Sequence, residues 1–382
     1  MFMLKRKTFL FLLFSCYIFS CTTVKKIPSQ ASQNITTLKF LGGYVIPNDL
    51  NYKDTRVGGL SGIDYDALHD QYYMVSDDRS AINPARFYTA KIFFTQKGID
   101  SVRFVKVNSM LQPNGKVYPN SSQDPLHTPD PEAIRYNPIL NQLIWSSEGE
   151  RIIKGKDTIL ENPAITIISP EGKFLDSLPV PDNLYMRSTE MGPRQNSVFE
   201  GLGFADNYKT LFVSVEEPLY EDGPRADVKE TNTCIRILKY SLGERKNTAQ
   251  YAYKLEPLAY LSTGYKINGV SDILALGDNK LMVIERSFST GRLACTIRLF
   301  LADLGEASDI KNIPSLKNDR SFKPATKKLL LNMDSLGIYI DNIEGLTFGP
   351  KLPNGHKTIL FIADNNFNLL QQSQLLLFEV SE

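Results

Sequence analysis

Acidic residues recur at matching places along the chain, and carboxylates are the side chains here best suited to chemistry. The first acidic set follows short phrases of apolar and small residues and comprises Glu132, Glu200, Asp272 and Glu344. The second acidic set ends runs of β-forming residues and comprises Asp77, Glu148, Glu216, Glu285 and Asp364. Carboxylates gathered at one place repel one another, and this raises their pKa values unless a cation lies among them. We therefore predict that the first set is catalytic and that the second set binds a metal ion.

Calcium is the metal that this composition favours. Ca²⁺ takes about six to eight oxygen ligands in irregular geometry. The chain has only 3 histidines and 4 cysteines, which argues against zinc or copper. His127, in the long segment before Glu132, is the one histidine placed to act as a base or ligand, and no Ser–His–Asp arrangement is indicated.

Arginines accompany the acids. We expect Arg79, Arg286 and Arg194 to bind substrate, because the planar guanidinium group forms paired hydrogen bonds with phosphate. Each of them could equally pair with a carboxylate. A glutamate at the start of a repeat could also serve only to accept hydrogen bonds from backbone amides of the next repeat.

A repeated phrase sets the positions of these acids. It reads LSGI (60–63), PEAI (131–134), FEGL (199–202), VSDI (270–273) and IEGL (343–346). Its second residue falls at positions 61, 132, 200, 271 and 344, so the steps are 71, 68, 71 and 73 residues. Such a period is typical of a repeat architecture. A turn and a β-rich run follow each phrase, as expected for a hairpin.

Two further strands complete each unit. Third strands are expected at 86–94, 164–169, 234–240, 295–301 and 374–380, and fourth strands at 102–107, 174–180, 250–255 and 328–332. The last repeat lacks a fourth strand, which the N-terminal segment 37–46 can supply. The sequence therefore predicts an all-β fold, a β-propeller of four-stranded antiparallel blades closed by an N-terminal strand. Five blades are counted, a sixth formed by the longer segments stays possible, and a two-sheet sandwich would leave the repeat spacing unexplained.

The propeller prediction explains why the acids should meet. In each blade, the inner strand begins and the second strand ends at the same face. Glu132 and Glu148 lie 16 residues apart, as do Glu200 and Glu216, so each hairpin folds such a pair together. We expect both acidic sets at one mouth of the central channel, with Asp78, Asp130, Glu150 and Glu217 close by.

The N-terminus resembles an export signal. Lys5, Arg6 and Lys7 precede an apolar run at 9–19, which is shorter than the roughly 20 residues of a transmembrane helix. The following Ser20-Cys21 resembles a bacterial lipobox, and plain secretion is the alternative. We expect a signal peptide at 1–21, lipidation of Cys21, a tether at 22–36 and one propeller domain at 37–382. The protein would then sit in the bacterial cell envelope, held to the membrane by its lipid alone.

Two other features limit the partners. Lysine and arginine total 43 against 42 acidic residues, with no basic stripe, so no nucleic-acid partner is expected. Cys234 and Cys295 fall at similar strand positions, where we expect buried, unpaired thiols rather than a disulfide framework.

The repeated phrases resemble a known family. GGLSGI (58–63), FEGL, GVSDI (269–273) and NIEGLT (342–347), with ADNNF (363–367), are similar to the phytase-like family, also called "esterase-like activity of phytase". The likeness runs in order over roughly residues 38–380. It implies a secreted or surface hydrolase of phosphate esters that uses calcium, with Glu132, Glu200, Asp272 and Glu344 as the matching acids.

The chain also departs from that pattern. Ser61 and Ser271 stand where other repeats have Glu. The five predicted blades are one fewer than in the well-known calcium-dependent propeller phytases, which leaves phytate hydrolysis open. The expected activity is a metal-dependent phosphoesterase acting on a small anionic substrate. The alternatives are a non-catalytic propeller that binds a ligand or partner protein, and a calcium-dependent lactonase or carboxylesterase.

Overall fold

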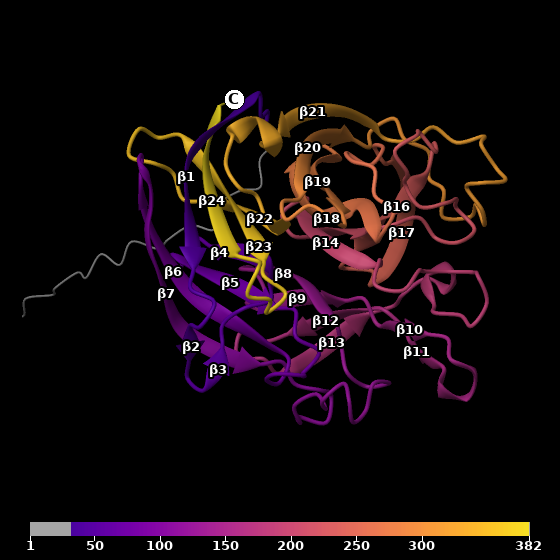
Figure 1. Ribbon diagram of the computed structural model, residues 1–382, viewed down its shortest axis with the longest axis horizontal. Helices are drawn as coiled ribbons and strands as arrows, with labels where there is room; N and C mark the ends of the chain where they lie inside the picture. Colours follow the sequence, from indigo (N-terminus) through magenta and orange to yellow (C-terminus); the bar gives the residue numbers. More distant parts are fainter. Residues whose placement is uncertain (1–31, 382) are drawn as a thin grey trace, which may run out of the picture.

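The repeats of the sequence form separate antiparallel sheets around a common axis in the computed structural model, which describes residues 32–381 (Figure 1). The first sheet contains β4 (Leu60–Asp66), β5 (Gln71–Ser76), β6 (Arg86–Thr95) and β7 (Gly98–Ser109). The second contains β8 (Pro131–Asn137), β9 (Gln142–Ser147), β12 (Ala164–Ile168) and β13 (Phe174–Leu178). The third contains β14 (Phe199–Ala205), β15 (Thr210–Val215), β16 (Cys234–Ser241) and β17 (Lys246–Lys254). The fourth contains β18 (Lys266–Gly277), β19 (Lys280–Ser289), β20 (Thr296–Asp303) and β21 (Thr326–Asn332).

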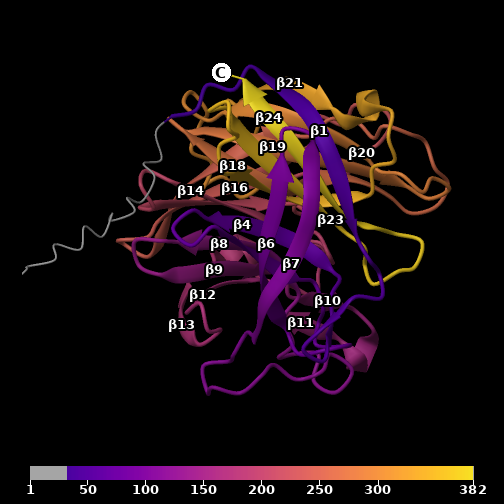
Figure 2. The same cartoon turned by 90° about the vertical axis from the view of Figure 1, so that its left-hand side faces the viewer.

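The fifth sheet joins strands from both ends of the chain. It contains β22 (Asn342–Gly349), β23 (Lys357–Asp364), β24 (Ser373–Ser381) and β1 (Thr37–Ile46). β1 pairs antiparallel with β24, from Thr37 opposite Ser381 to Ile46 opposite Ser373, and Figure 2 shows the two strands side by side. The N-terminal segment is therefore the fourth strand that the last repeat lacks.

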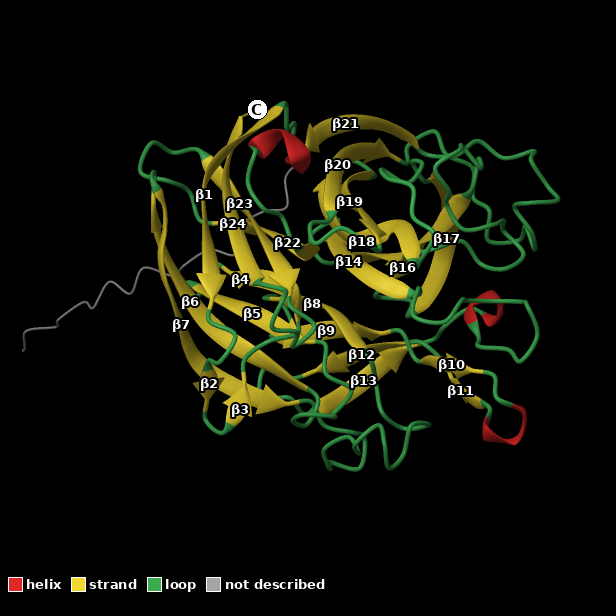
Figure 3. Cartoon of the chain, in the orientation of Figure 1, coloured by secondary structure: helices red, strands yellow, loops and turns green. Residues whose placement is uncertain are grey.

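The first strand of each sheet is innermost, and neighbouring inner strands contact one another in the order β4, β8, β14, β18, β22 and back to β4. The prediction of an all-β propeller is confirmed, with five blades, and residues 32–381 form no sixth. Smaller elements lie in the loops (Figure 3). They are β2 (Asn51–Tyr52), β3 (Thr55–Arg56), β10 (Glu150–Ile152), β11 (Ile159–Glu161) and the 3₁₀ turns η1 (Gly155–Asp157), η2 (Asp182–Leu184) and η3 (Met333–Leu336).

Each boundary between two blades has its own hydrophobic core. Successive side chains of a strand point to opposite faces of the sheet, so the apolar runs of the second strands serve two neighbours at once. Met74 of β5 packs against the fifth blade, whereas Val75 packs against the second blade. In the same way, Phe361 of β23 packs against the fourth blade and Ile362 packs against the first blade. Burial on both faces explains why these strands read as continuous apolar runs rather than alternating ones.

A β-bulge interrupts every inner strand at the repeated phrase. The register shifts between Leu60/Gly62, Pro131/Ile134, Phe199/Gly201, Val270/Asp272 and Ile343/Gly345. The bulged position is therefore Ser61, Glu132, Glu200, Ser271 or Glu344. A bulge redirects the side chain of the extra residue. It repeats five times here, at the end of the channel where the second strands finish.

Glycine follows the bulge in three blades because the inner strands approach one another closely there. A Cβ atom on Gly201 would lie 2.7 Å from the backbone nitrogen of Ile273 in the next blade. We expect Gly201→Ala to lower the free energy of unfolding by about 1–3 kcal/mol through overpacking, as measured by urea denaturation. Gly243→Ala is the control, since a Cβ atom there meets nothing within 4 Å. Equal stability of the two variants would contradict the close approach.

A buried ion pair fills the centre of the channel. Arg135 of β8 donates to Ile63 O at 2.8 Å, to Leu202 O at 2.8 Å and to both carboxylate oxygens of Asp272 at 2.8 and 2.7 Å. Asp272 also accepts from the backbone amide of Leu346 at 2.9 Å. The pair thus contacts all five inner strands and separates the two ends of the channel.

Three sequence predictions concern other regions. The predicted signal peptide and the lipidation site Cys21 lie outside the described residues. Within the described residues, Cys234 and Cys295 are buried free thiols, as predicted. No helix among these residues has the length and apolar character that a membrane span requires.

Candidate active site

Two structural positions bring carboxylates to one mouth of the channel. The bulges place Glu132, Glu200 and Glu344 at the start of the inner strands. The neighbouring second strands finish at the same end, followed by Asp77, Glu148 and Glu216 and, in the fifth blade, ending with Asp364 itself. With Asp130, which immediately precedes β8, these residues form what we call the carboxylate cluster.

Five members of the carboxylate cluster lie close together in two overlapping groups. Ligand oxygens of Asp77, Asp130 and Glu132 all lie within 4.8 Å of one another, and so do those of Glu132, Glu148 and Glu200. Glu132 therefore belongs to both groups of three. All of these residues except Asp77 are buried, and Glu148 has no exposed surface.

Two buried oxygens of the cluster have no hydrogen-bond donor. Glu148 accepts from the Val198 amide through Oε1, yet its Oε2 is buried without a partner. Asp364 likewise accepts from the Asn366 amide at 2.9 Å while its Oδ2 is unpaired. Buried acceptors without partners are rare and costly, so the cluster calls for protons or a cation.

The hydrogen bonds do not support the alternative role of the bulged glutamates, which was to accept hydrogen bonds from backbone amides of the next blade. Among the described residues, Glu132 and Glu200 accept from no backbone amide, and Glu344 accepts from the side chain of Asn342 at 2.8 Å. The backbone-binding carboxylate at this boundary is instead Glu148 of the second strand.

Burial and mutual repulsion dominate the electrostatics. Burial, and then the charge of Asp130, raises the pKa of Glu148 from 4.5 to about 8. Burial and neighbouring carboxylates also raise the pKa values of Asp77, Glu132 and Glu200 well above their usual range. The carboxyl groups of Asp77 and Asp130 face each other, as do those of Glu148 and Glu200, so each pair can share a proton when one member is protonated. Without a metal ion, the cluster therefore keeps several protons near neutral pH.

Arg286 is the cation inside the cluster. Its Nη2 lies 2.7 Å from Glu216 Oε1 and 3.7 Å from Glu344 Oε1. In the fourth blade Arg286 pairs with Gly269, whereas in the fifth blade Asp364 pairs with Asn342 at the equivalent position. The fourth blade thus supplies an arginine where the other four supply an acid.

Two predicted site residues of the fourth blade lie outside the cluster. Glu285 precedes Arg286 and points to the other side of the strand, where it accepts from Tyr253 Oη at 2.8 Å and Lys327 Nζ at 2.6 Å. Asp272 follows the bulge instead of occupying it, and its carboxylate is bound to Arg135. In both cases the predicted position is wrong by one residue, which turns the side chain to the opposite face.

The other predicted arginines border the site to different degrees. Arg79 is bonded to Glu150 through Nη1, and its Nε lies 3.8 Å from Asp130 Oδ2, so it flanks the cluster. Arg194 donates to Pro218 O at 2.9 Å and to Gly223 O at 2.8 Å, so it stabilises the loop after β15. His127 is exposed and bonded to Asp124, so it is not in the cluster.

Sequence reasoning missed the roles of Asp130 and Arg135 at the channel. Asp130 was expected only nearby, yet one of its carboxylate oxygens lies within 4.8 Å of oxygens of Asp77 and Glu132 in the cluster. The sequence feature that could have identified Asp130 is its position immediately before the repeated phrase PEAI. Arg135 has no counterpart of the same type in the other repeats, so no periodicity marked it.

Comparison with known proteins adds the family. The sequence has no match among curated proteins. Solved structures with a similar fold include an α-L-arabinofuranosidase from Lactobacillus brevis (9% identity, covering 88% of this chain and 92% of that chain, TM-score 0.45). They also include an endo-1,4-β-xylanase from Bacteroides thetaiotaomicron (9%, 91% and 96%, 0.45) and a periplasmic gluconolactonase from Pseudomonas aeruginosa (10%, 86% and 88%, 0.34). At these low identities and TM-scores, the likeness says nothing about activity.

The family profile described as "Phytase-like: Esterase-like activity of phytase" matches residues 55–367, which include every inner strand and the whole carboxylate cluster. Because this match spans well over half of the sequence, the chain belongs to the Phytase-like family.

Proposed function

We propose that this protein is a metal-dependent hydrolase of phosphate esters whose reaction centre is the carboxylate cluster. The observation that carries the proposal is the pair of overlapping carboxylate groups that share Glu132. Their buried oxygens, one of them unpaired on Glu148, match the all-oxygen coordination that calcium prefers. Membership of the Phytase-like family supports the choice of phosphate esters.

The residues present fit a cation. Asp77, Asp130 and Glu132 would hold it in one group, and Glu132, Glu148 and Glu200 in the other. A bound calcium ion would supply positive charge to the phosphate oxygens and make a bound water more acidic. This chemistry needs ionised carboxylates, so binding would displace the protons that the cluster otherwise retains.

Protein side chains would perform the remaining steps. Arg286, between Glu216 and Glu344, and Arg79 at the edge of the cluster carry charge for the oxygens of an anionic substrate. Glu148 Oε2 has no donor, so once cation binding has displaced the proton of this carboxyl group, the ionised oxygen could accept a proton from water. Several phosphates on one molecule would suit this set of cations better than a single neutral ester.

The test is phosphate release from phytate and from p-nitrophenyl phosphate by the purified protein, with calcium and with a chelator. We expect calcium-dependent release that falls about 100-fold or more in Glu200→Gln, because the amide cannot replace the carboxylate as a ligand or acid–base group. The matched control is Glu244→Gln, an exposed acid paired with Lys246, which should keep full activity. Calcium binding without turnover of either ester would favour a non-catalytic binding propeller. Turnover of a lactone or a carboxylic ester, without release of phosphate, would favour a calcium-dependent lactonase or carboxylesterase.

A further inference from the structure

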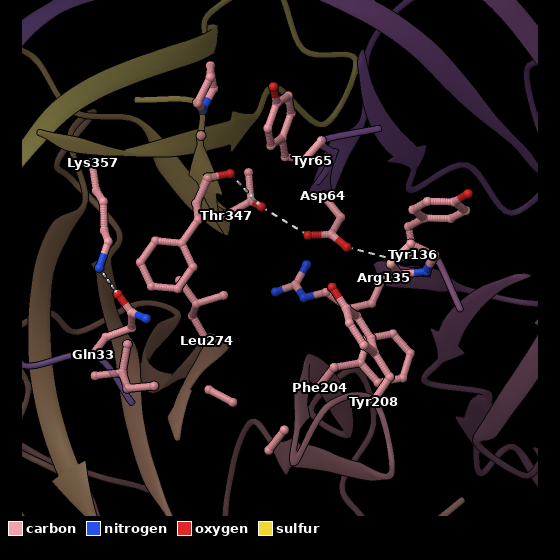
Figure 4. Close-up of a pocket in the computed structure, with 18 of the residues that line it drawn as sticks. Gln33, Asp64, Tyr65, Arg135, Tyr136, Phe204, Tyr208, Leu274, Thr347 and Lys357 are labelled. Atoms are coloured by element: carbon pink, nitrogen blue, oxygen red, sulfur yellow. Dashed lines mark hydrogen bonds between the residues drawn. The ribbon is translucent and has the colours of Figure 1, made fainter. Parts of the chain in front are cut away.

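The other end of the channel carries a pocket that the proposed hydrolase does not use. A cavity of about 420 Å³ opens there, lined by the far ends of the inner strands and by the turns that follow them (Figure 4). The Arg135–Asp272 pair lies between this pocket and the carboxylate cluster. The two ends of the channel are therefore separate sites.

Two carboxylates lie beside one guanidinium group at the floor of this pocket. Asp64 accepts from the Tyr136 amide at 2.8 Å and from Thr347 Oγ1 at 2.9 Å, and neither donor is charged. The adjacent Arg135 is committed to Asp272 through two contacts. Asp64, Asp272 and Arg135 thus combine two carboxylates with one guanidinium group. When both acids are ionised, these three side chains together carry a net charge of minus one.

Aromatic rings form much of the pocket wall. Tyr65, Phe204, Tyr208 and Phe348 line it together with aliphatic side chains such as Leu274. Aromatic faces attract an organic cation, most strongly where water is excluded. A carboxylate at the floor provides the complementary charge and an acceptor for an N–H donor.

The pocket also contains cationic side chains that limit its ligand. Lys357 lies across the pocket from Asp64, with its Nζ bonded to Gln33 Oε1 (Figure 4). Lys351 is an exposed lining residue. Their charge disfavours a cation with several positive groups. A ligand with one positive charge and an apolar body satisfies the floor and the walls together.

We infer that this pocket binds a small organic monocation, with its ammonium group at Asp64 and its apolar body against the aromatic rings. The inference does not depend on the proposed hydrolase activity. Occupancy neutralises the excess charge of the Asp64, Arg135 and Asp272 group.

The probes are benzylammonium and its neutral analogue benzyl alcohol, titrated into the purified full-length protein near neutral pH and followed by calorimetry. The ammonium ion is expected to bind about tenfold more tightly than the alcohol, which has the same ring but no charge. Asp64→Asn should remove this preference. Asp278→Asn, the same change at an exposed position on the same end of the molecule, should preserve it.

Three further outcomes decide the inference. Glu200→Gln should leave benzylammonium binding unchanged, whereas loss of binding in this variant would place the ammonium in the carboxylate cluster. Phe348→Leu should weaken ammonium binding more than alcohol binding, which remains informative if Asp64→Asn does not fold. Equal affinity for both probes, or binding of neither at millimolar concentration, would overturn the inference.

Discussion

Replacing Arg135 with methionine is expected to lower the free energy of unfolding by about 3–5 kcal/mol, because the change leaves a buried carboxylate without its cation. Arg135 and Asp272 are both almost fully buried, and the guanidinium group donates to backbone carbonyls of three other blades. Methionine keeps a stem of similar length but offers none of these donors. Urea denaturation of the purified variant measures the loss.

Two comparisons separate this effect from ordinary loss of an ion pair. Arg245→Met removes an exposed pair with Asp176 of similar length, 2.6 Å, and should cost less than about 1 kcal/mol. Adding Asp272→Asn to Arg135→Met removes the stranded charge and should recover part of the loss. If Arg135→Met costs no more than Arg245→Met, the pair is not what holds the inner strands together.

The architecture could be predicted from the sequence because its physical cause is periodic. Each blade must bury both faces, so each second strand is an apolar run with a turn before it. The repeated phrase is equally constrained, since its bulge and the small residue that follows let neighbouring inner strands approach. Patterns imposed at every blade appear in the sequence with the spacing of the blades.

The fourth blade shows where such reasoning fails. Residue type alone favours Asp272 and Glu285 as site residues, because both match the acids of the other repeats. The bulge gives Ser271 the position of the glutamates, and Arg286 takes the position of the second acidic set. Spacing was the better guide, since Ser271 follows Glu200 by 71 residues and Arg286 follows Glu216 by 70. At this position of the five blades, four acids and one arginine also repel one another less than five acids would.

The centre of the channel could not be predicted from repeats at all. Strand register places Asp64, Arg135, Gly203, Leu274 and Thr347 at one level, one from each blade. A narrow axis has room for one long side chain, so the five residues differ instead of repeating. The Arg135 contact with Asp272 joins residues 137 positions apart, and no local pattern encodes it.

The carboxylate cluster should make the stability of the protein depend strongly on pH. In the metal-free protein, the melting temperature is expected to fall as the pH rises from about 5 to about 8. Burial raises the pKa of Glu148 from 4.5 to about 8 and raises those of Glu132, Glu200 and Asp77 as well. In this pH range the unfolded chain has released these protons while the folded protein still holds them. Each proton that the folded protein holds in excess therefore lowers the free energy of unfolding by about 1.4 kcal/mol per pH unit.

Calcium is expected to reverse this trend, since it binds the ionised carboxylates and competes with the same protons. The rise in melting temperature on adding calcium should be small near pH 5 and largest near pH 8. Thermal scans at both pH values, with calcium or with a chelator, measure it.

Glu148→Gln tests whether the carboxyl groups of the cluster cause both the pH dependence and the calcium response of the melting temperature. The amide has no proton to lose, so the variant should have a flatter pH dependence without metal and a smaller response to calcium. Glu244→Gln, an exposed acid, should change neither. A metal-free melting temperature that rises over this range would mean that Arg286 and Arg79 already compensate the cluster. With no calcium response either, the carboxylates would then be a purely structural network, and the hydrolase proposal would lose its metal site.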